Sequence, residues 1–359
     1  MARMDLAEFL TGALAELDQK NLLRRLPDLQ NIDIGFSRNT YLGNHFGASG
    51  SRLISGNHRL YARLERELSL WKKTAAALVY PAGYMTNLGV ISALLDRGDL
   101  IILDKLCHAS LIDGARLAQA DIRVFKHNNP ADLEKILRQS RNYKKILVVT
   151  ESVFSMDGDR APLAELTALR RQYGFWLLVD EAHAVGVFGE SGEGLAGQLG
   201  MNGDIDIQIG TFSKAFDGLG GYVCGSRLLI DYLVNKSRAF IYTTALPKII
   251  LRKNLANLKK VQSKKQRRKL WKNINYFSAR LGIRADSAII PLLIGDEKKA
   301  LALAEKLRDE GFIIPAIRYP TVPRGQARLR LTISAETTKR QMNKLLALLN
   351  QRRKNRALK

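Results

Sequence analysis

The chain has 359 residues, enough for two or three domains, and its 46% apolar content is that of an ordinary globular protein. No apolar run is long enough to span a bilayer, and Met1 to Glu8 contain two acidic residues instead of an apolar signal core. We therefore expect a cytoplasmic protein without a membrane segment. Its two cysteines, Cys107 and Cys224, cannot form a disulfide framework and are expected to be free thiols.

The positive charge is large and partly local. Lys and Arg total 57 against 34 Asp and Glu, which gives a formal net charge of +23. Residues 252–272 and the C-terminal tail are crowded with Lys and Arg, which raises the hypothesis of a nucleic-acid partner. The helical spacing of Leu251, Leu255, Leu258 and Val261 favours a helix with a solvated basic face instead. A third interpretation is electrostatic steering of an anionic substrate, such as one carried by coenzyme A or an acidic carrier protein.

The first element in chain order is an amphipathic helix predicted over residues 5–23. Its apolar residues share one face, and Asp5 can cap its start. We expect residues 1–45 to form this helix and a substrate-contacting segment. The glycine-rich polar stretch at 47–57 is typical of a flexible loop, although glycines also let the backbone approach a ligand closely.

From residue 60 onward, helix and strand patterns alternate. Short apolar runs predict seven strands, at 75–80, 100–103, 122–125, 145–150, 176–180, 205–211 and 221–225. Helices are predicted at 61–71, from the turn at 81–84 to Leu95, and at 110–118, 130–141 and 162–173. Apolar strands separated by helices form a mostly parallel sheet covered on both faces, so we expect an α/β fold with a large domain at 46–250.

The pattern changes after a basic linker helix. Strands are predicted at 288–294, 312–317 and 328–333, and helices at 297–310 and 337–351. This pattern predicts a smaller α+β domain at 251–359.

Polar residues follow several of the predicted strands of the large domain. Ligands of parallel sheets bind beyond the carboxyl ends of the strands, so we expect these side chains to meet at one site. They are Gly83, His108, Glu151, Asp180, His183 and Lys214.

Lys214 and Asp180 point to pyridoxal 5′-phosphate (PLP) as the cofactor. Lys214 lies just past a strand end among small residues, Asp180 ends another strand, and His183 follows three residues later. PLP needs an amine to hold its aldehyde and an acid to partner its pyridine nitrogen. We predict that Lys214 supplies the amine and then acts as general base at Cα of an amino-acid substrate, while Asp180 keeps the ring nitrogen protonated.

The remaining handles of PLP also have candidate partners. His183 could hydrogen-bond the ring hydroxyl. His108 begins a predicted helix and could stack on the ring, although capping is the commoner role for a histidine there. Gly83 and Tyr84 open a helix whose N-terminus suits a phosphate, and Thr211 offers a hydroxyl.

Other chemistries lack their residues. The five histidines and two cysteines show no zinc-ligand spacing, and no calcium ligand follows Asp157-Gly158-Asp159, so we predict no metal. The chain has no Gly-x-Ser-x-Gly elbow, no P-loop and no Rossmann glycine fingerprint.

The chain resembles the α-oxoamine synthases, which are fold-type-I PLP-dependent transferases. The resemblance runs from about Phe36 to Leu349 and rests on several motifs in a fixed order. They are Asn39-Thr40-Tyr41-Leu42-Gly43, the stretch from Ser49 to Asn57, Asp104 to Ser110, Thr150 to Asp159, Asp180-Glu181-Ala182-His183, Thr211-Phe212-Ser213-Lys214, Pro320-Thr321-Val322-Pro323 and Ala327 to Thr332.

The resemblance implies a homodimer with the cofactor at its interface. Thr244 would reach the phosphate bound in the partner subunit, and Glu151 and Ser155 would line the cofactor site. Arg330, whose guanidinium suits a carboxylate, would bind the substrate amino acid together with Asn39 and Arg24. The implied activity is that of an acyltransferase, which condenses an amino acid with an acyl thioester and releases CO2.

Within the family, Ala316-Ile317-Arg318 before the Pro-Thr-Val-Pro run resembles the members of biotin biosynthesis. These condense L-alanine with a pimeloyl thioester of coenzyme A or acyl carrier protein (ACP). Two alternatives stay open: a sibling that uses glycine or serine with another acyl-CoA, and a degenerate PLP scaffold that binds polyanions.

The chain departs from the family pattern at two places. Between Gly43 and Gly47 the family usually has a longer connection that forms a helix, whereas here only Asn44-His45-Phe46 intervene. Ala82 stands where many relatives have a serine, so one hydroxyl near the expected phosphate is missing.

Overall fold

The computed structural model describes residues 3–27, 39 and 47–357. The motif at 36–43, apart from Asn39, and the short connection at 44–46 therefore lie outside the described residues. The chain divides into two compact units. Unit 1 consists of residues 1–152 and 161–262, and unit 2 of residues 153–160 and 263–359.

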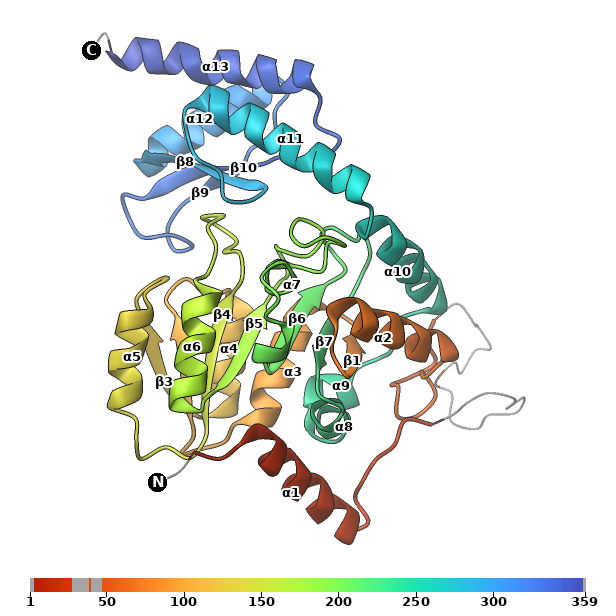
Figure 1. The fold of residues 1–359 in the computed structure, drawn as a ribbon. Coiled ribbons are helices and arrows are strands. Elements are labelled where there is room, and N and C mark those ends of the chain that lie inside the picture. The colour runs from red at the N-terminus through yellow and green to blue at the C-terminus, as the bar shows by residue number, and fades with distance from the viewer. Residues whose placement is uncertain (1–2, 28–38, 40–46, 358–359) are drawn as a thin grey trace. The chain divides into compact units, whose positions relative to one another are not determined.

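Unit 1 is built on a seven-stranded sheet with the order β1-β7-β6-β5-β4-β2-β3 (Figure 1). Only β7 runs antiparallel to its neighbours; the other pairs are parallel, which confirms the predicted mostly parallel sheet. The strands are β1 Ala76–Tyr80, β2 Leu100–Asp104, β3 Asp121–Phe125, β4 Ile146–Glu151, β5 Trp176–Asp180, β6 Ile207–Thr211 and β7 Gly221–Gly225.

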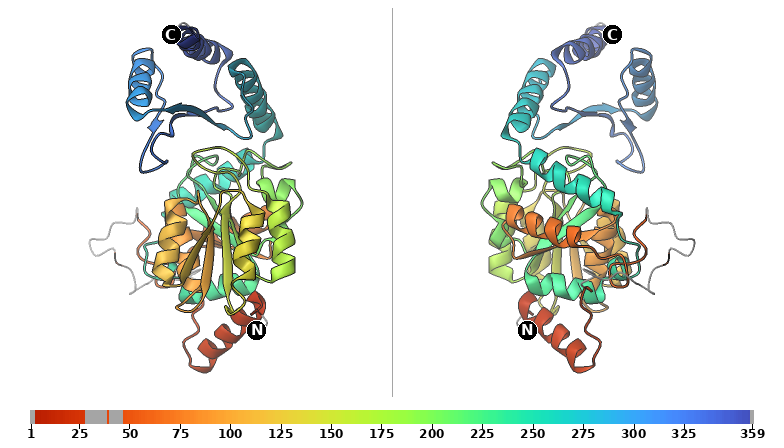
Figure 2. Two further views of the ribbon diagram at one scale, coloured as in Figure 1. Left: turned by 90° about the vertical axis from the view of Figure 1, so that its left-hand side faces the viewer. Right: turned by 90° about the vertical axis from the view of Figure 1, so that its right-hand side faces the viewer.

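Helices cover both faces of this sheet, as the two side views show (Figure 2). The helices are α1 Leu6–Gln19, α2 Arg59–Lys72, α3 Gly83–Leu94, α4 Ala109–Ala118, α5 Pro130–Arg138, α6 Leu163–Tyr173, α7 Leu195–Gln198, α8 Arg227–Lys236, α9 Arg238–Ile241 and α10 Lys248–Val261. Alternate strand residues face opposite ways: Leu78 and Tyr80 join the core cluster beneath α1, α3, α4, α8 and α9, while Ala77 and Val79 join the cluster beneath α2 and α10.

The edge strand β3 differs from the other strands. The prediction of strands covered on both faces holds for the six other strands, which are fully buried. In β3, Ile122 and Val124 are exposed, whereas β1 at the opposite edge of the sheet is buried along its whole length.

Unit 2 is a small α+β unit. Its three-stranded antiparallel sheet has the order β8-β10-β9, with β8 Ile289–Gly295, β9 Ala316–Ile317 and β10 Ala327–Thr332. Side chains of α11 Lys264–Leu281, α12 Glu297–Asp309 and α13 Lys339–Ala357 build one apolar cluster with it. The strand predicted at 312–317 shrinks to the two residues of β9, because Pro315 lacks the N–H that a strand ladder requires.

Unit 2 also includes residues 153–160, which follow β4 of unit 1 in the chain. An ion pair joins Asp157 to Arg328 of β10, and Gly158 lies so close to Ile289 that a side chain there would clash with the backbone of β8. The predicted boundary between residues 250 and 251 falls inside α10, whose Leu251 and Leu258 belong to a core cluster of unit 1. The division lies between Gln262 and Ser263 instead, where Ser263 caps α11.

Among the helices of the described residues, none is both long enough and apolar enough to cross a membrane.

Candidate active site

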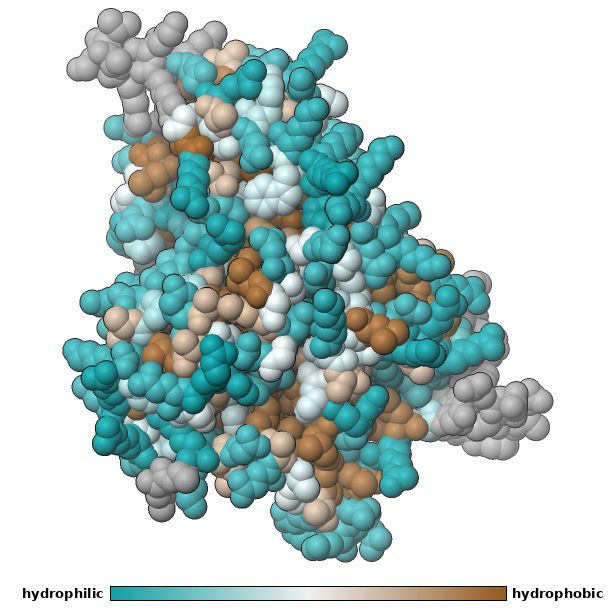
Figure 3. Space-filling view, viewed as in Figure 1, coloured by the Kyte–Doolittle hydropathy of each residue, from teal (hydrophilic) through white to brown (hydrophobic). Residues whose placement is uncertain are grey.

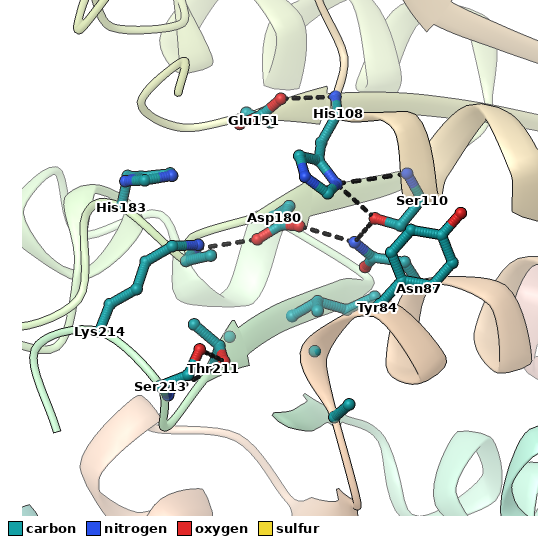
Figure 4. Close-up of a pocket in the computed structure, with 15 residues that line it drawn as sticks. Tyr84, Asn87, His108, Ser110, Glu151, Asp180, His183, Thr211, Ser213 and Lys214 are labelled. Atoms are coloured by element: carbon teal, nitrogen blue, oxygen red, sulfur yellow. Dashed lines mark hydrogen bonds between the residues drawn. The ribbon is translucent and has the colours of Figure 1, made fainter. Parts of the chain in front are cut away.

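A pocket of about 270 Å³ opens at the carboxyl ends of the parallel strands in unit 1 (Figure 4). Its lining combines the ends of β4, β5 and β6 with the starts of α3 and α4. Eight residues singled out from the sequence meet here: Gly83, Tyr84, His108, Glu151, Asp180, His183, Thr211 and Lys214.

Asp180 lies at the centre of the polar side of the pocket. It ends β5 and is only 6% exposed. Its Oδ2 accepts a hydrogen bond from Asn87 Nδ2 at 2.9 Å, and its Oδ1 accepts one from the Ala182 N–H at 2.9 Å. Both oxygens are therefore fixed in place by donors from α3 and from the turn after β5.

His108 is held as a neutral imidazole of one tautomer. Asn87 Nδ2 also donates to Ser110 Oγ, at 2.8 Å, so the Ser110 hydroxyl hydrogen is available to His108 Nδ1, 2.7 Å away. Nδ1 also accepts from the Ser110 N–H, which leaves the proton on Nε2. The pKa of His108 lies below its usual range, mainly because of burial and also because of the positive charge of Lys214.

The His108 side chain caps α4, which is the commoner of the two roles weighed from the sequence, and its ring also lines the pocket. The Tyr84 ring meets the His108 ring edge to face, with centroids 6.3 Å apart. The Tyr84 hydroxyl donates to Asp113 and points away from the other polar groups.

Glu151 is a second buried carboxyl group, at the end of β4. It accepts a hydrogen bond of 2.7 Å from the His108 N–H. Burial and the nearby charges of Asp180 and Asp104 raise the pKa of Glu151 well above its usual range. Glu151 therefore holds a proton far more tightly than an ordinary glutamate.

Lys214 projects into this pocket from a tight turn after β6. The turn is closed by backbone hydrogen bonds from Phe212 to Gly220 and from Gly218 to Phe212. Phe212 and Phe216 on either side are buried and pack edge to face, which anchors the turn while Lys214 stays exposed. In Figure 4 its side chain extends toward Asp180.

The start of α3 forms the opposite end of the pocket. Its N-cap residue, Ala82, provides no side-chain cap, so the first N–H groups of the helix remain available to an anion. Thr211 and Ser213 add two hydroxyls, 2.9 Å apart. A Cβ at Gly83 would lie 3.1 Å from Thr211 Oγ1, so glycine lets the strand end and the helix start come close.

Three polar lining residues were given no role in the sequence analysis: Asn87, Ser110 and Ser213. The available signal was their spacing, since Asn87 lies one helical turn after Gly83 and Ser110 two residues after His108.

The other predicted residues are not part of this lining. Arg330 and Ser155 belong to unit 2, where Arg330 Nε donates to the Ser155 carbonyl at 2.5 Å and burial lowers the Arg330 pKa. Arg24 donates to the Asn235 carbonyl at 3.0 Å and is exposed. The Asn39 N–H donates to the Ser49 carbonyl, and Thr244 is exposed.

A buried ion pair supports the segment that carries Asp180 and His183. Lys72 and Glu181 form this pair at 1% and 0% exposure. Lys72 Nζ also donates to the Glu193 carbonyl at 2.5 Å, and Glu181 Oε1 accepts from the Ala196 N–H at 2.9 Å. The loop from 181 to 196 is thereby fastened to α2.

Comparison with known proteins identifies the family. Residues 30–349 match the family model described as aminotransferase class I and II. The 8-amino-7-oxononanoate synthase of Bacillus pumilus is 40% identical over 365 residues, covering 95% of this chain and 93% of the relative. The 8-amino-7-oxononanoate synthase 1 of Bacillus subtilis is 37% identical over 377 residues, covering 95% and 96%.

Solved structures of two relatives share the fold. The 8-amino-7-oxononanoate synthase of Francisella tularensis superposes with a TM-score of 0.74 at 30% identity, covering 86% of this chain and 90% of that one. Serine palmitoyltransferase of S. paucimobilis, solved with bound PLP and myriocin, superposes with a TM-score of 0.81 at 35% identity, covering 84% of this chain and 78% of that one.

The chain therefore belongs to the aminotransferase class I and II family, whose fold is the fold-type-I fold of PLP enzymes. More narrowly, it is a PLP-dependent acyltransferase of the α-oxoamine synthase group. The pocket fits this cofactor: it offers an amine, a fixed carboxylate, a neutral imidazole, and an uncapped helix start beside two hydroxyls.

Proposed function

We propose that this chain is an 8-amino-7-oxononanoate synthase of the cytoplasm, which condenses L-alanine with a pimeloyl thioester in biotin biosynthesis. The observation that carries the proposal is the likeness to synthases of that name over almost the whole length of both chains. The pocket supports it, because every group that the chemistry requires of unit 1 is present.

When bound, PLP draws electrons from Cα of the amino acid and so makes the Cα–H bond acidic. Lys214 would provide the amine that holds the cofactor aldehyde, and Asp180 would partner the ring nitrogen. The neutral His108 ring would line the cofactor site without adding a second positive charge to the pocket. The start of α3 and the hydroxyls of Thr211 and Ser213 would bind the phosphate.

Lys214 then moves protons at the substrate. Its neutral amine takes the Cα proton, and Cα forms a bond to the thioester carbonyl carbon while the carbon–sulfur bond breaks and the thiol leaves. The original carboxylate departs as CO2, and Cα regains a proton. His183 would hydrogen-bond the cofactor hydroxyl and so help to keep the ring oriented.

The substrate side involves residues beyond the pocket lining. We propose that Arg330 binds the carboxylate of the amino acid and that Asn39 and Arg24 assist substrate binding. In a homodimer, Thr244 would reach the phosphate in the partner subunit, and Ser155 would complete the cofactor site. Coenzyme A and acyl carrier protein are both candidate carriers of the pimeloyl group.

Thiol release from pimeloyl-CoA by the PLP-loaded protein tests the proposal, with L-alanine, glycine and L-serine as separate co-substrates and Lys214→Ala as the control. We expect release with alanine only and none from the control. Release with serine alone would favour the second candidate, a serine-condensing synthase. This candidate is supported by the TM-score of 0.81 to serine palmitoyltransferase. Pimeloyl-ACP as a further substrate distinguishes the two carriers.

A further inference from the structure

The excess charge of this chain is confined to two segments. Residues 232–285 contain 15 Lys and Arg and no Asp or Glu, and residues 337–359 contain eight and none. These 23 cations equal the formal net charge of +23, so the remainder of the chain is balanced. The charge is thus a local feature of particular helices and not a general property of the surface.

In unit 2 both segments form helices that pack against each other. Apolar residues of α11 and α13 share the core cluster of unit 2, among them Phe277, Leu281, Met342 and Leu346. At the seam between the helices, Tyr276 of α11 donates to Asn343 Oδ1 of α13 at 2.6 Å and lies beneath the Arg280 guanidinium, 3.7 Å from its centroid. The two helices therefore present one continuous surface.

The exposed side of α11 is a basic stripe. Lys265, Arg268, Lys269 and Lys272 are all exposed and follow one another on one face, over about 10 Å of helix. Lys265 and Lys269, and likewise Arg268 and Lys272, stand four residues apart, where like charges destabilise a helix. Among the described residues, none of these four has an ion-pair partner.

The composition of this surface selects the kind of partner. Protein–protein interfaces have an apolar centre, but none of the exposed large hydrophobic residues belongs to α11 or to the part of α13 whose side chains are described. A membrane-surface helix needs a free apolar face, and here that face is buried in the core of unit 2. Over α11 the surface is mainly hydrophilic (Figure 3). Cations without apolar anchors match a phosphate backbone.

We propose that the α11 stripe, Lys265, Arg268, Lys269 and Lys272, binds the phosphate backbone of nucleic acid without regard to sequence, as an activity separate from catalysis. Counterions that the stripe must otherwise retain are released on binding, and this release provides the driving force. Residues 232–285 contain no acidic residue, and this observation favours a binding surface over a merely solvated helix face.

Binding of a short fluorescent DNA duplex to the PLP-loaded protein, followed by anisotropy over a series of salt concentrations, tests this proposal. We expect a Kd of about 1–100 μM near physiological salt, and we expect the affinity to fall as the salt concentration rises. In a plot of the logarithm of the association constant against the logarithm of the salt concentration, the slope is negative. The fourfold variant K265Q/R268Q/K269Q/K272Q should reduce the magnitude of this slope by roughly two to four, since each lost phosphate contact removes about 0.9.

The matched control is K298Q/K299Q/K306Q/R308Q on α12. These four cations are also exposed but are interspersed with Glu297, Glu305 and Asp309, and their removal changes the net charge by the same amount. We expect this control to retain the wild-type slope. Equal losses in both variants, or no duplex binding by the wild type, would overturn the proposal, as would a preference of the stripe for an acidic protein such as ACP over the duplex.

Thiol release and cofactor absorbance of the α11 variant, measured in parallel, show whether it is folded. Both should equal the wild type, because the stripe has no part in the cofactor pocket. Loss of duplex binding with intact thiol release, or the reverse, separates this proposal from the proposed function.

Discussion

Two lysines of unit 1, Lys214 and Lys72, lie in opposite kinds of surroundings. Lys214 is exposed, stands on a turn and faces the pocket, whereas Lys72 is 1% exposed and neutralised by Glu181. The amine of Lys214 is therefore accessible to a reactant, whereas the amine of Lys72 serves only to stabilise the fold. The difference lies in burial: Lys72 Nζ is enclosed between the Glu181 carboxylate and the Glu193 carbonyl, whereas Lys214 stands on an exposed turn.

The strongest test of this contrast is Lys214→Ala. We expect turnover to fall by at least about 10³-fold, because the general base and the amine that holds the cofactor are both lost. The free energy of unfolding of the apo protein should change by less than about 0.5 kcal/mol, since the side chain is exposed. Thiol release and urea unfolding measure the two effects, and a large loss of stability would contradict a purely chemical role.

Lys72→Met should show the reverse pattern. It leaves the Glu181 carboxylate buried and unpaired, so we expect a loss of about 3–5 kcal/mol in the free energy of unfolding. The protein that remains folded should still show the absorbance of lysine-bound cofactor, because Lys214 is present. The double variant K72M/E181Q should recover part of the loss. A single variant that lost under about 1 kcal/mol would show that the ion pair does not fasten the loop.

Asn87→Leu sharpens the comparison on the pocket side. It removes the donor to Asp180 Oδ2 and to Ser110 Oγ while roughly keeping the side-chain volume. An unsatisfied buried acceptor costs about 1–3 kcal/mol, so we expect a moderate loss of stability and a turnover about tenfold lower. Thiol release together with the affinity for PLP, measured by absorbance titration, provides the check. Unchanged affinity and turnover would mean that Asp180 needs no support from α3.

Glu151→Gln should produce the smallest effect, and one that depends on pH. The pKa of Glu151 is raised in the folded protein, so its contribution to stability is complete below the unfolded pKa and is lost as pH rises toward the folded pKa. Glutamine can still accept from the His108 N–H and does not titrate. We expect equal stability at pH 4.5 and an advantage for the variant of about 1 kcal/mol or more at pH 8, measured by urea unfolding of both apo proteins. A difference independent of pH would contradict the raised pKa.

The sequence was sufficient for features that depend on local pattern. Apolar runs located all seven strands of unit 1, and the strand-end rule brought Gly83, Asp180 and Lys214 to one pocket. It also contained an unused signal: Ser226 caps α8, and Leu229, Ile230 and Leu233 bury one face of this helix, but no helix was predicted there.

Features that depend on which elements become neighbours could not be predicted in the same way. Asn87 is a polar residue in an apolar helix, and only the placement of α3 beside β5 explains it. Likewise, a linker of continuous helical pattern predicted one helix, where the Ser263 cap instead separates α10 from α11. The inclusion of residues 153–160 in unit 2 depends on Arg328, which is 171 residues from Asp157.

This insertion has a consequence for synthesis on the ribosome. Residues 153–160 emerge directly after Ser152, but their partners Ile289 and Arg328 are translated more than a hundred residues later. Translation at about 5–20 residues per second imposes a delay of roughly ten seconds. During this delay, residues 153–160 of the nascent chain lack their contacts with Ile289 and Arg328. Unit 1 can thus fold ahead of time, while the segment next to Glu151 reaches its final state only when β10 has left the exit tunnel.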